Sequence, residues 1–138
     1  MRVLAVDHGE KNIGLAVSDE TGTLARPLGV IRHISKAADA AQVAERAQRE
    51  QADLIIVGVS YDEDGAPNLA GRRAIRFAET LRAHTPLPVT LWDESLTTHD
   101  ARAARLAAGA SRKRRTGHLD EWAAAVLLQD YLDSQEKR

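Results

Sequence analysis

The sequence of 138 residues contains no cysteine, which excludes disulfides, zinc–thiolate centres and cysteine nucleophiles. Aromatic residues make up only 4% and do not cluster, so a platform on which single-stranded bases stack is not expected. Long hydrophobic runs are also lacking, because LIIVGV and AAAVLL fall far short of the roughly 20 residues that cross a bilayer. The chain enters a strand-like pattern directly, without a signal-peptide pattern. We therefore expect a cytoplasmic protein.

Neither sign of charge dominates, since the formal net charge is −1. With 43% hydrophobic and 28% charged residues, the composition is that of a soluble globular protein, and the length fits one domain over residues 1–138. The local distribution of charge is more informative than the sum. One basic run consists of Arg112, Lys113, Arg114 and Arg115. It is either a solvated loop that aids solubility or a phosphate-binding element, and its position shortly before Asp120 favours phosphate binding.

Apolar runs and helical periodicity predict five strands and four helices. The strands are expected at residues 3–7, 13–18, 28–33, 53–59 and 89–93. Helices are expected at 37–51, at 69–83, from Thr97 or Thr98 to near Gly109, and near the C-terminus. The apolar stripe of the last helix is expected to comprise Leu119, Trp122, Ala123, Val126, Leu127 and Tyr131.

This order of elements predicts an α/β fold. The first three strands are separated by turns too short for a helix, so they must pair antiparallel. Each later strand follows a helix, which favours parallel pairing. The expected architecture is a mixed five-stranded sheet, three strands antiparallel and then two parallel, with helices on both faces.

Three carboxylates lie at the edges of apolar runs, where an uncompensated charge is costly. Asp7 and Glu94 follow predicted strands, and Asp120 opens the last helix. Oxygen ligands of this kind suit hard divalent cations such as Mg²⁺ or Mn²⁺. Because the three are far apart in sequence, only the fold can bring them together.

Each carboxylate also has a simpler explanation. Asp7 could simply be the turn-forming residue of an Asp-x-Gly loop. Asp120 could simply stabilise the N-terminus of its helix through a favourable interaction with the helix dipole. Glu94 could be a solvated strand-end carboxylate, and it competes with Asp93, which strand alternation places on the opposite face. Small residues one turn after Asp120 favour close packing of that helix on the sheet. Convergence on one site is the interpretation that accounts for all three.

Four motifs occur in an order and spacing that resemble one known family. They are VDHGEKNIGLAVSD at residues 6–19, IVGVSYDEDG at 56–65, LWDESLTT at 91–98 and AGASRKRRTGHLDEWAAAVLLQDYL at 108–132. Together they resemble the YqgF family, also called RuvX, whose fold is ribonuclease H-like. Two positions depart from the family pattern: Ser60 stands where Pro is usual, and Asn12 stands where a basic residue is frequent, which leaves Lys11.

The resemblance implies a divalent-metal-dependent nuclease that acts in pre-16S rRNA 5′-end maturation, in Holliday junction resolution, or in both. The family's acidic positions fall on Asp7, Glu94 and Asp120, which would hold two Mg²⁺ or Mn²⁺ ions. Lys11 and the basic run at 112–115 would hold flanking phosphates of structured RNA or branched DNA. The sequence does not decide between RNA and DNA, or between a monomer and a homodimer.

Two alternatives belong to other functional classes. The chain could be a non-catalytic nucleic-acid-binding factor in transcription or ribosome maturation, although retention of all three carboxylates argues against it. It could instead bind a nucleotide through the loop at 7–14, although the second domain of such proteins is lacking. No pair among the five histidines has metal-ligand spacing, so surface positions are expected for them, including His99 and His118 near the proposed site.

Overall fold

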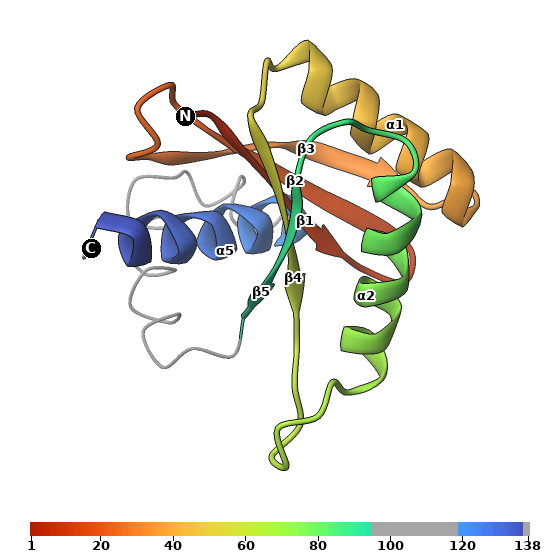
Figure 1. Cartoon of the computed structure of the whole chain (residues 1–138). Coiled ribbons are helices and arrows are strands. Elements are labelled where there is room, and N and C mark those ends of the chain that lie inside the picture. The colour runs from red at the N-terminus through yellow and green to blue at the C-terminus, as the bar shows by residue number, and fades with distance from the viewer. Residues whose placement is uncertain (95–118, 137–138) are drawn as a thin grey trace.

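The computed structural model describes residues 1–94 and 119–136. Its centre is a five-stranded sheet with helices α1 and α2 on one face and helix α5 on the other (Figure 1). The strands are β1 (Val3–His8), β2 (Asn12–Ser18), β3 (Ala25–Arg32), β4 (Leu54–Val59) and β5 (Val89–Asp93). The helices are α1 (Lys36–Arg49), α2 (Leu69–Arg82) and α5 (Leu119–Glu136). The predicted mixed sheet is confirmed.

The order of strands in the sheet is β3-β2-β1-β4-β5. Strands β1, β2 and β3 pair antiparallel, whereas β4 pairs parallel with both β1 and β5, as predicted. The carboxyl ends of β1, β4 and β5 therefore lie at one edge of the sheet. The predicted helix after Thr97 or Thr98, the basic run at 112–115, His99 and His118 lie outside the described residues. Within the described ranges, no helix is long and apolar enough to cross a membrane.

Alternation along β1 distributes its side chains between two cores. Leu4 and Val6 pack in the core beneath α1 and α2, whereas Val3 and Ala5 pack in the core beneath α5. Both cores are apolar, which is why the central strands contain continuous hydrophobic runs. The same alternation assigns the next residue, Asp7, to the α5 face.

Strand β3 begins at Ala25, three residues before the predicted start, and it includes Pro27. Proline cannot donate a ladder hydrogen bond, and the sequence predicts that it precedes the strand. It is accommodated because β3 is the outermost strand of the sheet. The register also shifts here: Gly29 pairs with Leu15 and Pro27 pairs with Ala16, so β3 has an extra residue at this point.

The predicted apolar stripe of α5 is wrong in part. Trp122 and Tyr131 pack against the core beneath α5, as predicted, but Ala123 is only half-buried and residues 124–128 are all buried. Ala124 and Leu128 pack against the sheet with Leu127. The run AAAVLL is apolar at every position, so it has no period from which the sequence could identify the sheet-facing side.

The loop that follows β4 is anchored at Ser60, one of the two positions at which the sequence departs from the family pattern. The Ser60 hydroxyl donates to Asn68 Oδ1 at 2.7 Å, and the Asn68 backbone N–H donates to the Ser60 carbonyl at 3.2 Å. Asn68 is also the N-cap of α2 and accepts a hydrogen bond from Gly71 N–H at 2.8 Å. Ser60 therefore ties the end of β4 to the start of α2.

Candidate active site

Asp7 lies near the carboxyl end of β1 and is half-buried. It pairs with Gly14 of β2 across the antiparallel side of the strand. On its other side, β1 pairs parallel with β4, and the last pair in this register is Val6 with Val57. One position further along both strands, Asp7 lies beside Gly58. Neighbouring strands are about 4.8 Å apart, which places Asp7 one strand spacing from Gly58.

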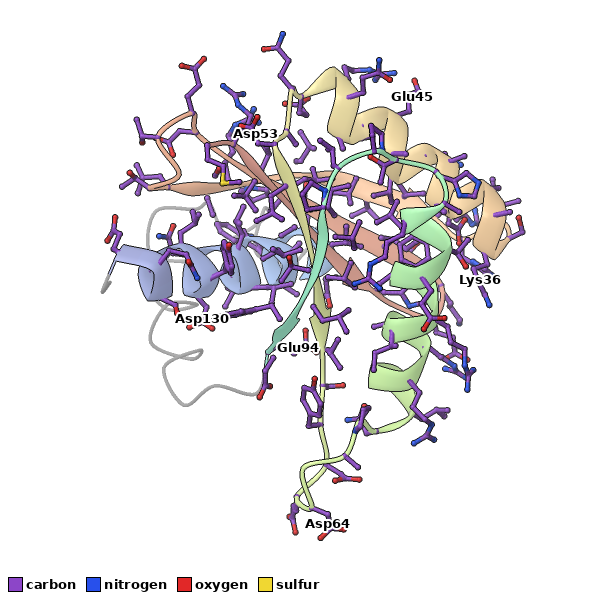
Figure 2. All side chains as sticks on the ribbon, viewed as in Figure 1. Lys36, Glu45, Asp53, Asp64, Glu94 and Asp130 are labelled. Carbon is purple, nitrogen blue, oxygen red and sulfur yellow. The ribbon has the colours of Figure 1, made fainter. Side chains whose placement is uncertain are left out.

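Glu94 follows β5 directly, and its backbone is held to β4. The Glu94 N–H donates to the carbonyl of Val59 at 3.1 Å. Its side chain lies over Gly58, because a Cβ built on that glycine would be 2.7 Å from Glu94 Oε2. Figure 2 shows Glu94 at the end of β5, next to β4. The Glu94 carboxylate thus lies over β4, at the same edge and on the same face of the sheet as Asp7.

Gly58 lies directly beneath the Glu94 carboxylate, and the sequence interpretation did not single it out. A Cβ on this residue would meet Leu127 Cδ2 at 2.8 Å as well as the Glu94 carboxylate. Only the absence of a side chain leaves room for a carboxylate between β4 and α5. The available signal was a glycine inside the buried run LIIVGV, since a glycine within a strand often marks close approach by another group.

Burial raises the pKa of the Glu94 carboxyl, and the nearby charge of Asp93 raises it further. Asp93 itself is exposed. Along β5, Leu91 packs in the core beneath α1 and α2, whereas Trp92 packs in the core beneath α5. Alternation therefore assigns Asp93 to the face of Leu91, away from Glu94, as expected from the sequence. A bound cation beside Glu94 would offset its desolvated charge.

We expect Glu94→Gln to stabilise the metal-free fold at neutral pH. Because the folded-state pKa is raised above 4.5, ionised Glu94 destabilises the native state, and this cost grows as the pH rises through that folded-state pKa. The neutral amide removes the cost, so the melting temperature in chelator should exceed that of the wild type. The difference should vanish below about pH 4, where the carboxyl is protonated in both states.

The matched control for this measurement is Glu63→Gln, which neutralises an exposed carboxylate in the loop after β4. It should leave the melting temperature nearly unchanged. An equal stabilisation by both substitutions would show that general charge repulsion, and not burial of Glu94, sets the effect.

Asp120 is the second residue of α5, one turn before Ala124, which is buried against the sheet. Its side chain is not among those described. Within the described part of the chain, no group of three acidic or histidine residues that could hold a metal is found. The three-carboxylate centre therefore stays a prediction, in which Asp7 and Glu94 share one face and edge. Lys11 is exposed in the turn after β1, and its carbonyl accepts from His33 N–H at 2.9 Å.

The fold is ribonuclease H-like, and it is similar to that of a Holliday junction resolvase. The Thermus thermophilus RuvC structure, described as being in complex with a Holliday junction substrate, matches 99% of this chain and 96% of its own, with a TM-score of 0.65 and 18% identity. At that identity the match shows the fold alone. The chain belongs to the RuvX family, described as Holliday junction resolvase, whose model matches residues 1–134. The resemblance inferred from the four motifs is confirmed.

Curated relatives align with essentially the full length of the chain. A protein of Symbiobacterium thermophilum is 41% identical over 138 residues, covering 100% of this chain and 96% of its own. One of Thermoanaerobacter pseudethanolicus is 36% identical over 139 residues and covers 100% of both. Both are named "Putative pre-16S rRNA nuclease".

Proposed function

We propose that the chain is a divalent-metal-dependent nuclease that hydrolyses phosphodiester bonds, with residues 1–138 acting as one nuclease domain. The observation that carries the proposal is the Glu94 carboxylate lying over Gly58, beside the register position of Asp7. In this proposal, Asp7 and Glu94 are two of the three metal ligands, and the shared face and carboxyl edge of the sheet support that assignment. Membership of the RuvX family supports the same activity.

Asp7, Glu94 and Asp120 would hold Mg²⁺ or Mn²⁺ in a two-metal site. The room left by Gly58 and the all-oxygen donor set fit such ions. When bound, the ions would activate a water molecule for in-line attack and stabilise the departing oxygen. Asp7 would contribute to holding both ions, and Glu94 and Asp120 would supply the remaining protein ligands. The protein orients Glu94 through its backbone hydrogen bond to Val59.

The proposed substrate is pre-16S rRNA near its 5′ end, a Holliday junction, or both, consistent with the names of the relatives and of the structural neighbour. Lys11 and the basic run at 112–115 would hold the flanking phosphates. Such contacts position the backbone and carry little sequence information. Symmetric cutting of a junction would require two copies of the site and therefore a homodimer. We place this activity in the cytoplasm.

The proposal is tested with the wild-type chain on labelled precursor rRNA and on a four-way DNA junction. Cleavage of at least one substrate should require Mg²⁺ or Mn²⁺ and should stop when the metal is chelated. Binding of both substrates is measured in chelator in the same series. A chain that binds these substrates but cuts neither with either metal would instead be a non-catalytic nucleic-acid-binding factor.

A further inference from the structure

A cavity of about 300 Å³ lies on the face of the sheet opposite Glu94. Its lining comes from the end of β1, the segment after β3, the start of α1 and one side of α2. His8 lines it from β1 and follows Asp7 directly, so alternation places these two neighbours on opposite faces of the sheet. The cavity therefore shares the sheet edge of the candidate active site but belongs to the other face.

Three permanent cations from two helices line the cavity: Lys36 at the start of α1, and Arg73 and Arg76 on α2. Arg73 is partly neutralised by Glu10, whose Oε1 lies 3.7 Å from its guanidinium. Lys36 and Arg76 form no ion pair with the described residues. Figure 2 shows Lys36 at the end of α1 that lies near α2. Two exposed cations thus line one cavity, and in the described part of the chain neither forms an ion pair with a carboxylate.

The buried carboxylate of this cavity, Asp39, is already engaged. Asp39 is fully buried; one of its oxygens lies 2.5 Å from His33 Nδ1, and the other accepts from Ile34 N–H at 3.0 Å. Both of its carboxylate oxygens therefore already have a partner within the protein. Because Asp39 occupies Nδ1, the ring nitrogen that His33 can offer a ligand is Nε2.

His8 adds a second oriented imidazole to the cavity. Its ring stacks on the buried ring of Phe77, with centroids 4.8 Å apart and planes inclined by 31°. This contact and the Asp39 pairing of His33 restrict both rings before any ligand arrives. Preorganised donors bind a ligand with less loss of conformational entropy than mobile ones.

We infer that this cavity binds a phosphate group, carried either by a free nucleotide or by the backbone of a nucleic acid. Donors reach it from four separate segments, an arrangement suited to a tetrahedral anion that accepts hydrogen bonds in several directions. The planar guanidinium of Arg76 matches phosphate oxygens in a bidentate manner. The volume is near the lower end for ligand pockets, about 300–1,000 Å³, and fits a phosphate with an attached sugar.

The test is an NMR titration of the full chain in chelator with inorganic phosphate and with AMP. Saturable shifts are expected in the imidazole signals of His8 and His33 and in the guanidinium signal of Arg76. Arg76→Gln and Lys36→Met should each weaken the affinity about tenfold, the scale of one lost charge-assisted contact. Chelator removes divalent metals, so the result does not depend on the proposed nuclease site.

The matched control is Arg49→Gln, which removes one cation from the far end of α1, where Arg49 pairs with Glu45. It should leave phosphate affinity unchanged. Binding of precursor rRNA and of the four-way junction to the same variants distinguishes the two phosphate sources. If Arg76→Gln weakens AMP binding alone, the source is a nucleotide; if it also weakens nucleic-acid binding, the source is the backbone.

Absence of saturable shifts, together with unchanged nucleic-acid binding in both cavity variants, would overturn the inference. An equal loss of affinity in Arg49→Gln would overturn it too, since it would show attraction by overall charge. Circular dichroism checks that each variant folds. If Arg76→Gln does not fold, Lys36→Met decides the result, because Lys36 is an exposed residue in the first turn of its helix.

Discussion

Asp7→Asn should abolish Mg²⁺- or Mn²⁺-dependent cleavage and leave the fold intact. Asparagine is nearly isosteric with aspartate and can still form the turn that follows β1. Its neutral amide neither bridges two cations nor offsets their charge. Loss of one preorganised electrostatic group costs about 10²–10³ in rate, and loss of a bridging ligand should cost at least as much. The measurement is single-turnover cleavage of labelled RNA and four-way junction with metal.

Nucleic-acid binding by Asp7→Asn should persist in chelator, or tighten, because one negative charge facing the phosphate is removed. Asp64→Asn is the control: it makes the same chemical change at an exposed residue in the loop after β4 (Figure 2). The control should cleave like the wild type. Wild-type cleavage by Asp7→Asn would exclude Asp7 as a metal ligand.

Gly58→Ala should lower cleavage by about a hundredfold, the scale expected for misplacing a catalytic group by about 1 Å. The added methyl group would lie 2.7 Å from Glu94 Oε2 and 2.8 Å from Leu127 Cδ2, so the carboxylate must leave its position. Overpacking against Leu127 should also destabilise the fold by about 1–3 kcal/mol. Cleavage rates and denaturant unfolding measure the two effects separately.

Val57→Ile is the matched control for Gly58→Ala. It adds one methyl group to the neighbouring residue of β4, in the core beneath α1 and α2 and away from Glu94. It should destabilise the fold to a similar extent and retain cleavage. If both variants lost cleavage equally, lower stability and not displacement of Glu94 would be the cause.

The sheet was predictable because its strands have strong local signals. Short turns separate the first three strands and helices separate the rest, which determines antiparallel and parallel pairing. The start of β3 was not predictable, since the pairing that accommodates Pro27 depends on the partner strand. The side of α5 that faces the sheet was not predictable either, because the run AAAVLL contains no polar residue to mark the opposite side.

Asp7 and Glu94 could be proposed as site residues from the sequence because each follows an apolar strand run. Gly58 could not, because a glycine in such a run indicates close approach without naming the approaching group. No sequence motif indicates the phosphate cavity, because His8, Lys36 and Arg76 are far apart in the sequence. They come together only when α1 and α2 pack over β1. The expectation of surface histidines is wrong for His8, which is half-buried and stacked on Phe77.

Strand β5 is the last of the described sheet and pairs only with β4 there. It has five residues, and Glu94 is the next residue of the chain. Outer strands of this kind open with a smaller free energy than the strands at the centre of a sheet. Transient detachment of β5 would withdraw Glu94 from Asp7 while the other four strands stay paired. In the proposed nuclease, heat should therefore abolish cleavage at a lower temperature than it unfolds the molecule, and one short outer strand, not the hydrophobic core, would set the lifetime of the activity.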